Sequence, residues 1–237
     1  MGAENIYGDD IARVSTVLGM WNDDPGEKLM DWAGAMGYRW RGVREDAATI
    51  GTHTHKLIED TLTLVQRGAL KVDSLDDDAE SMQRFMEGAA DVPAKFQKPV
   101  SLAFGAFVRW ASSFAVVEPT ALEETIICQE WGLGGTCDFK GILDAGDGSG
   151  PKRVMIDWKT SSRTSMKHKV QLGAYSLLHR HKYPDDPPFD YYGVIRFCKK
   201  TGVFEQHWTD YDDLQNDEEF FLKLLDIYRS RKTLQMF

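Results

Sequence analysis

Cysteine is scarce in this sequence, and its spacing excludes two common kinds of scaffold. The 237 residues contain three cysteines, Cys128, Cys137 and Cys198, with no Cys-x-x-Cys pair among them. An odd number of widely spaced cysteines argues against both a disulfide framework and a structural zinc site. We therefore expect buried thiols in strands.

Long apolar runs are also lacking. No stretch approaches the roughly twenty consecutive apolar residues of a membrane-spanning helix, and the first residues lack the basic and apolar regions of a secretory signal. The composition, 42% hydrophobic, suffices for one sizeable core. We expect one cytoplasmic domain over 1–237 with no membrane contact, divided into a mostly helical part (1–118), a sheet core (119–210) and a closing helix (211–237).

Positive charge is in deficit overall. The chain carries 28 Lys and Arg against 37 Asp and Glu, a net charge of −9, which argues against a partner recognised through its phosphates. The distribution weakens this objection, because residues 151–182 carry a net charge of +7 and the remainder −16. A solvated helix face with a charged loop is the alternative explanation of this basic segment.

Hydrophobic periodicity and turn residues predict a helical first half followed by alternating strands and helices. We predict helices over 25–36, 46–66, 77–90, 100–114, 166–181 and 213–232, strands over 124–131, 136–145, 154–159, 191–197 and 203–208, and a turn over 132–135. The type of segment 11–18 stays open, since it suits a strand or the start of a helix.

The strand over 154–159 carries an acid and a lysine two residues apart. Successive strand residues alternate between faces, so Asp157 and Lys159 share one face with Met155. Val154, Ile156 and Trp158 form the other face. Asp138 lies nineteen positions upstream on the partner strand, where it faces opposite to Phe139 and Cys137. A hairpin would bring this second carboxylate alongside the first.

Two converging carboxylates and a lysine predict a metal site that activates water. Mg²⁺ prefers oxygen ligands, which Asp138, Asp157 and the backbone carbonyl of Trp158 offer. His55 could complete the set and make Mn²⁺ acceptable. Lys159 would orient or deprotonate the attacking water and stabilise the charge that builds on a phosphate.

His55 belongs to a helical segment in which Glu59 lies four residues later, on the same face. An imidazole beside a carboxylate suits a metal ligand supported by a nearby acid. A surface ion pair has the same spacing, so the segment alone leaves both interpretations open.

Together these motifs resemble the RecB-like branch of the PD-(D/E)XK nucleases. The resemblance rests on Gly-Thr-x-Asp (135–138), on the apolar strand ending in Asp157-Trp158-Lys159-Thr160, on Gln171-x-x-x-Tyr175, and on Gly51-Thr52-x-x-His55-x-x-x-Glu59. The opening segment 14–18 is similar to the start of compact phage and Cas4-related members. The motifs span 55–175, about half of the chain.

The resemblance implies an α/β fold, a restriction-endonuclease-like central mixed β-sheet flanked by helices, with a helical N-terminal elaboration. It implies that His55, Asp138 and Asp157 bind Mg²⁺ or Mn²⁺ and that Lys159 is the catalytic lysine. Gln171 and Tyr175 would position the lysine or the DNA strand. Some relatives hold an iron–sulfur cluster with four cysteines, and the three scattered cysteines here predict no cluster.

We therefore expect a metal-dependent DNA exonuclease, phage-encoded, that acts in recombination, repair or replication on single- or double-stranded DNA ends in the host cytoplasm. The basic residues near the site, Arg163, Lys167 and Lys169, are the expected DNA contacts, and a recombinase or single-strand annealing protein is a candidate partner.

Two other interpretations compete with this hypothesis. The chain could be a non-catalytic DNA-binding or recombination-partner module that retains the nuclease fold, although such a relative would be expected to lose at least one site residue. Asp138, Asp157 and Lys159 could also form a structural ion-pair network, but burying three charges without a metal is costly.

Overall fold

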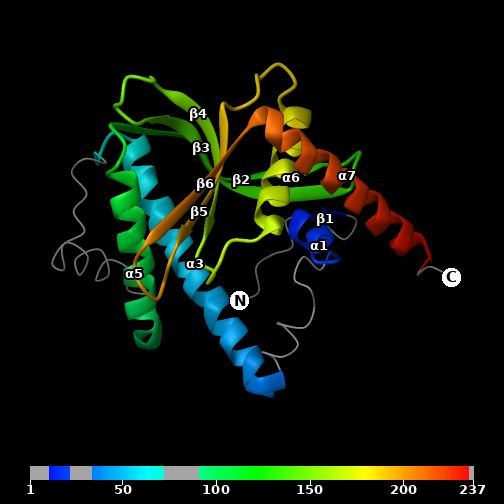
Figure 1. The fold of residues 1–237 in the computed structure, drawn as a ribbon, viewed down its shortest axis with the longest axis horizontal. Helices are drawn as coiled ribbons and strands as arrows, with labels where there is room; N and C mark the ends of the chain where they lie inside the picture. Colours follow the sequence, from blue (N-terminus) through cyan, green and yellow to red (C-terminus); the bar gives the residue numbers. More distant parts are fainter. Residues whose placement is uncertain (1–10, 22–33, 72–90, 235–237) are drawn as a thin grey trace.

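The computed structural model describes residues 11–21, 34–71 and 91–234. The elements run in the order β1 (Ala12–Arg13), α1 (Val14–Leu18), α3 (Arg39–Gln66), α5 (Ala94–Ala111), β2 (Val116–Cys128), β3 (Leu133–Asp144), β4 (Lys152–Lys159), α6 (Met166–Lys182), β5 (Tyr191–Phe197), β6 (Phe204–Asp210) and α7 (Tyr211–Leu234). Figure 1 shows a central sheet with α3 and α5 on one side and α1, α6 and α7 on the other.

The sheet is mixed, as predicted, and in the described chain it has six strands. The order β1-β3-β4-β5-β6 forms the main path, and β2 pairs antiparallel with β3 along its whole length. β3 pairs antiparallel with β4, whereas β4 pairs parallel with β5. The helix α6 makes the crossover between these two parallel strands, which gives the α/β arrangement flanked by helices.

Two hydrophobic clusters fill the space on the two sides of the sheet. The α3–α5 side contains Val154, Ile156 and Trp158 from β4, and the α6–α7 side contains Met155 from the same strand. The predicted alternation of β4 is therefore confirmed. The Trp158 ring is 2% exposed, and it packs against the aromatic rings of Phe107, Trp110, Phe139 and Phe197.

The predicted alternation of β3 is wrong around Asp138. Cys137 belongs to the cluster on the α6 side, while Phe139 belongs to the cluster on the α3–α5 side. Asp138 lies near His55 of α3, whereas Lys140 contacts His179 of α6. The inversion occurs where the β3–β4 pairing ends, at Phe139↔Ile156, and opposite Glu123 of β2, whose φ of 46° departs from strand geometry.

Several predicted boundaries differ from the observed ones. The strand predicted over 124–131 is the longer β2, and the turn predicted over 132–135 is wrong because Gly134 and Gly135 lie within β3. Pairing with β3 begins at Val116, so β2 includes residues before 124 whose sequence does not by itself predict a strand. Gly132, at a φ of 56°, closes the actual turn, where a residue without Cβ is favoured.

Two helices, α3 and α5, start earlier than predicted. α3 begins at Arg39 rather than 46, and α5 begins at Ala94 rather than 100 and contains Pro99. Burial of one face of α5, including Val100, Phe104 and Phe107, offsets the hydrogen bond that Pro99 cannot donate. Segment 11–18 contains both: the short strand β1 (Ala12–Arg13) and the helix α1 (Val14–Leu18). The predicted helix 77–90 lies outside the described residues, and of 25–36 only the helical residues 34–36 are described.

No helix in the described ranges combines the length and apolar composition that crossing a membrane requires.

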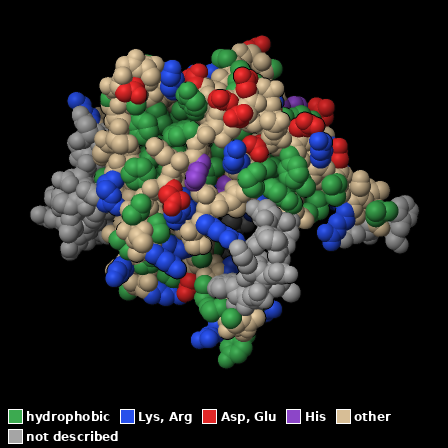
Figure 2. All heavy atoms as spheres, viewed as in Figure 1, with side chains coloured by type: hydrophobic (Ala, Val, Ile, Leu, Met, Phe, Trp, Pro, Cys, Tyr) green, Lys and Arg blue, Asp and Glu red, His purple; other side chains and the backbone are tan. Residues whose placement is uncertain are grey.

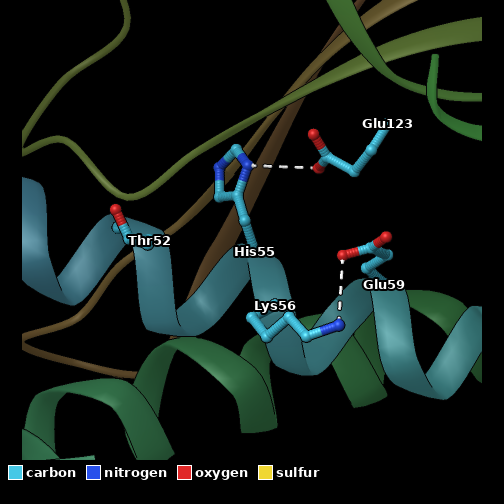
Figure 3. Close-up of a pocket in the computed structure, with 6 residues that line it drawn as sticks. Thr52, His55, Lys56, Glu59 and Glu123 are labelled. Atoms are coloured by element: carbon cyan, nitrogen blue, oxygen red, sulfur yellow. Dashed lines mark hydrogen bonds and ion pairs between the residues drawn. The ribbon is translucent and has the colours of Figure 1, made fainter. Parts of the chain in front are cut away.

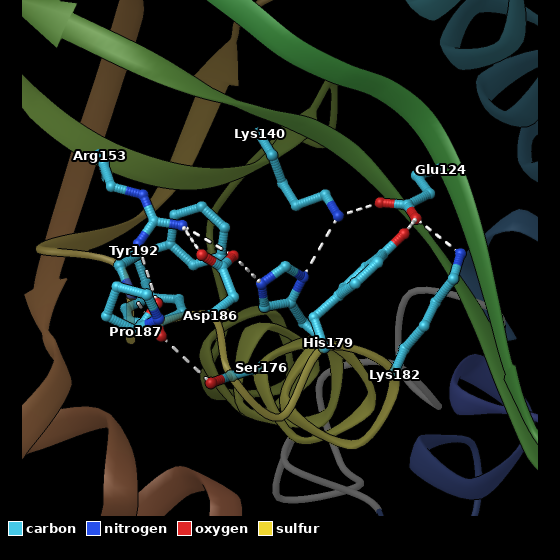
Figure 4. A network of polar contacts seen from close by, with 11 residues as sticks. Glu124, Lys140, Arg153, Ser176, His179, Lys182, Asp186, Pro187 and Tyr192 are labelled. Carbon is cyan, nitrogen blue, oxygen red and sulfur yellow. Dashed lines mark hydrogen bonds and ion pairs between the residues drawn. The ribbon is translucent and has the colours of Figure 1, made fainter.

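A polar network supports β2 and β3 on the α6 side of the sheet (Figure 4). Lys140, 4% exposed, forms an ion pair with Glu124 and lies 3.3 Å from Nδ1 of His179. Glu124 also accepts hydrogen bonds from Lys182 at 2.8 Å and from the Tyr183 hydroxyl at 2.6 Å. Burial raises the pKa of Glu124, but these three donors lower it by more, to about 2. The network therefore requires the ionised carboxylate.

This network predicts a specific pH dependence of stability. A carboxyl whose pKa is lowered by folding contributes stability that is present above its unfolded value, about 4.5, and is lost as the pH falls through about 2. Glu124→Gln should therefore lower the free energy of unfolding in urea at pH 7, and the difference from the unsubstituted protein should shrink as the pH falls from 4.5 towards 2. Glu130→Gln, at an exposed turn position, is the control and should show no such dependence.

Candidate active site

The edge of β3 that faces β4 is left open over four residues, within the described chain. β1 pairs with Leu133 and Gly134, and β4 pairs only from Phe139 onward. Tyr175 of α6 packs at this opening, because a Cβ at Gly135 would lie 2.6 Å from its ring. The glycine of the Gly-Thr-x-Asp motif therefore makes room for the tyrosine of the Gln-x-x-x-Tyr motif.

Asp138 lies at the end of this opening and connects the two diverging strands. It is 8% exposed, and its Oδ2 accepts a hydrogen bond of 2.6 Å from the backbone N–H of Trp158. β4 meanwhile continues to pair with β5 as far as Lys159. The side chain of Asp138 thus takes the place of a backbone carbonyl of β3, which fixes Asp138 beside the Asp157-Trp158-Lys159 segment.

His55, Glu123 and Asp138 form a group whose ligand atoms all lie within 4.8 Å of one another. The Nδ1 atom of His55 lies 3.7 Å from Oε1 of Glu123 and 3.8 Å from Oδ1 of Asp138. Figure 3 shows the imidazole projecting from α3 towards the Glu123 carboxylate on β2. His55 and Glu123 also line an open pocket of about 470 Å³, so this group is reachable from solvent.

The electrostatics of this group favour a cation. Burial lowers the pKa of His55, but Asp138 and Glu123 raise it by more, to about 9. Burial raises the pKa of Asp138, an effect that the positive charges of His55 and Lys159 oppose. A positive charge between Asp138 and Glu123, such as the protonated His55, therefore interacts favourably with both carboxylates.

Asp157 and Lys159 form an ion pair next to this group, as their shared strand face predicts. Asp157 is 1% exposed, and its Oδ2 atom is the one that contacts the Lys159 ammonium group. Burial raises the pKa of Asp157. The positive charge of Lys159 lowers this pKa, and the negative charge of Asp138 raises it further. The buried carboxylates of Asp138 and Asp157 thus interact unfavourably, and Lys159 lies close enough to offset part of this repulsion.

Gln171 and Tyr175 meet one turn apart on α6. The Gln171 amide donates a hydrogen bond of 2.6 Å to the Tyr175 hydroxyl. Burial raises the pKa of Tyr175 well above its usual value, and the negative charges of Asp157 and Asp138 raise it further. The phenol therefore keeps its proton near these two carboxylates and can act as a hydrogen-bond donor.

The donor set fits a divalent metal ion. One imidazole nitrogen and the carboxylates of Glu123 and Asp138 are ligands that Mn²⁺ accepts, and the carboxylates also suit Mg²⁺. Asp157, whose Oδ2 atom pairs with Lys159, is a further buried carboxylate next to this group. His55, Glu123 and Asp138 are thus the residues placed to hold such an ion, with Asp157 beside them.

The roles of the other predicted site residues stay predictions, and Glu59 lines the same pocket as His55 and Glu123. Glu59 lies further along α3 and pairs with Lys56 at 3.5 Å (Figure 3). Trp158 contributes its N–H to Asp138, and the role of its carbonyl stays a prediction. Lys169 lies 3.9 Å from Asp217 of α7. The remaining two predicted DNA contacts belong to the loop after β4 and the first turn of α6, and their role also stays a prediction: Arg163 and Lys167.

Glu123 is the member of the group that the sequence patterns missed. The predicted strand begins at 124, one residue after Glu123, so the local pattern gives this carboxylate no place in the site. The hairpin pairs Leu122 with Phe139 and Glu124 with Cys137, which places Glu123 opposite Asp138. Its φ of 46° is unusual for a residue with a side chain. A hairpin register counted back from a turn ending at Gly132 would have revealed it.

A search among curated proteins finds no match for the chain. The family model of the PD-(D/E)XK nuclease superfamily matches residues 33–234, a range that includes the whole group described above. The buried carboxylates, the lysine and the imidazole lie together on the sheet and helices of this matched region, and the chain belongs to the PD-(D/E)XK nuclease superfamily.

Proposed function

We propose that this protein is a metal-dependent DNA exonuclease of the RecB-like, phage type that hydrolyses phosphodiester bonds during recombination, repair or replication in the host cytoplasm. The observation that carries this proposal is the convergence of His55, Glu123 and Asp138 at one point, with the Asp157–Lys159 ion pair beside them. Membership of the superfamily supports nucleic acid as the substrate.

Each residue then has a distinct task. His55, Glu123, Asp138 and Asp157 would hold Mg²⁺ or Mn²⁺, which lowers the pKa of a bound water and polarises a phosphodiester. Lys159, anchored by Asp157, supplies a positive charge for the pentavalent phosphate of the transition state. The protonated Tyr175 hydroxyl, which accepts a bond from Gln171, can donate to the substrate or orient the neighbouring carboxylates.

The assignment of Glu123 as a metal ligand predicts a difference between two glutamates of the same pocket. Glu123→Gln should weaken Mn²⁺ binding about tenfold or more, because it removes one of three converging donors. Glu59→Gln is the matched control and should change the affinity by less than about twofold, since Glu59 pairs with Lys56. Isothermal titration with Mn²⁺ measures both. An equal loss in the two variants would contradict the assignment.

Lys159→Ala should reduce the rate of DNA hydrolysis by a factor of about 10² to 10³, which is the typical cost of removing one group that stabilises transition-state charge. Circular dichroism and thermal unfolding should show that the fold persists. Lys56→Ala, at an exposed lysine of the pocket lined by His55 and Glu123, is the control and should retain most activity. Full activity in Lys159→Ala would remove this lysine from the mechanism.

The exonuclease assignment is tested with DNA ends. Linear DNA labelled at its 5′ or 3′ end should be degraded in the presence of Mg²⁺ or Mn²⁺, whereas covalently closed circular DNA of the same sequence should persist. Release of label as mononucleotides or short oligonucleotides measures the reaction. Cleavage of the circular form at a similar rate would make the enzyme an endonuclease, and binding without any cleavage would favour the non-catalytic module.

A further inference from the structure

One face of α3 leads from the proposed site to the exposed beginning of the helix. Counting back from His55 by four, seven, eleven and fourteen residues reaches Gly51, Ala48, Arg44 and Arg41. These intervals are whole numbers of helical turns to within about 40°, so the five residues form one row. At about 1.5 Å per residue, the row from Arg41 to His55 is about 21 Å long.

The far end of this row is basic and faces solvent. Arg41 and Arg44 are exposed, and neither forms an ion pair with any residue that the structure describes. The Arg41 guanidinium lies over the ring of the half-buried Trp40, 5.6 Å from its centroid. The nearby acid Asp46 is occupied on the α5 side, where it pairs with Lys95 at 2.9 Å.

Positive charge in the first turn of α3 does not stabilise the helix through its dipole. The first turn of α3 contains no acidic residue, and positive charge near a helix N-terminus opposes the helix dipole. On one flank of the row the surface has the same sign: Lys199, in the β5–β6 turn, donates to the backbone oxygen of Ala47 at 3.5 Å, and Lys200 beside it is exposed. On the other flank lies the exposed acid Glu45. Figure 2 shows Lys and Arg side chains around the lower end of the molecule, where α3 begins, and acidic side chains over the N-terminal half of α7.

We propose that the face of α3 from Arg41 to His55 binds the backbone of one DNA strand on its way to the metal site, with unpaired bases stacking near Trp40. This inference rests on the proposed nuclease function and adds the path of the substrate. A single row of side chains can follow one phosphate backbone. Ala48 is small and exposed on this row. Gly51 lets the helix approach Thr160, the residue after Lys159, because a Cβ at Gly51 would lie 3.4 Å from the Thr160 Oγ1 atom. Two guanidiniums that form no ion pair within the described residues, together with an aromatic ring, suit single-stranded DNA.

The length of the row sets the length of strand that reaches it. At about 3.4 Å per nucleotide of a stacked strand, 21 Å corresponds to about six nucleotides. A four-nucleotide strand in the site would stop short of the arginines, whereas a twelve-nucleotide strand would reach them. The affinity of the protein for DNA should therefore rise with length in a way that depends on Arg41 and Arg44.

The test measures binding of fluorescein-labelled dT4 and dT12 by anisotropy in EDTA, where hydrolysis is suppressed. The double variant Arg41→Ala/Arg44→Ala should lose about tenfold in affinity for dT12, with a smaller salt dependence because each lost phosphate contact removes about 0.7 from the slope. Its affinity for dT4 should change by less than about twofold. Trp40→Ala should weaken dT12 binding about fivefold or more, and Trp40→Phe should restore part of it.

Arg39→Ala is the matched control, because Arg39 is equally basic and exposed but lies on the opposite face of the same turn. An affinity for dT12 that is unchanged in the double variant, or an equal loss in Arg39→Ala, would overturn the proposed path. An equal loss for a twelve-base-pair duplex would overturn its preference for a single strand.

Failure of this inference is distinguishable from failure of the nuclease assignment. If the unsubstituted protein hydrolyses DNA but the double variant binds dT12 normally, the enzyme stands and the path falls. If dT12 binding depends on the two arginines but no metal supports hydrolysis, the binding face stands and the nuclease assignment falls.

Discussion

The hydrogen bond from the Trp158 N–H to Asp138 holds the proposed catalytic centre together. It forms where β3 leaves β4, so the carboxylate replaces a strand partner at the point where the ladder ends. A buried N–H without a partner would be costly, and this cost ties Asp138 to β4. One oxygen of Asp138 is thereby fixed to the strand that carries Asp157 and Lys159, while the other faces His55.

The same divergence explains why this region concentrates buried charge. Asp138 and Asp157 are both nearly inaccessible to solvent, and burial raises the pKa of each. Their ionised forms depend on positive charge nearby, which Lys159 and His55 supply from different elements. A divalent cation would serve the same electrostatic purpose. Structure and charge therefore agree on one location for the chemistry of a superfamily nuclease.

Two adjacent glutamates of β2 serve opposite sides of the sheet. Glu123 turns towards His55, and Glu124 is held by Lys140, Lys182 and Tyr183 on the α6 side. The anchoring of Glu124 keeps β2 in place next to Glu123, whose φ of 46° is strained. On the α3 side, the helix that carries His55 extends outward to the exposed, positively charged Arg41 and Arg44. These are the residues that we propose to contact a DNA strand.

The sequence by itself determined the features that depend on local periodicity. Asp157 and Lys159 share a face because strand side chains alternate, and Gln171 meets Tyr175 because a helix repeats after about four residues. The mixed sheet flanked by helices followed from the resemblance of the motifs to the PD-(D/E)XK nucleases. Only the tertiary structure decided the inversion at Asp138, the entry of Glu123 into the site, and the pairing of Lys169 with Asp217. These features depend on where one strand stops pairing with another and on which helix packs against it, and such contacts join residues that are distant in the chain.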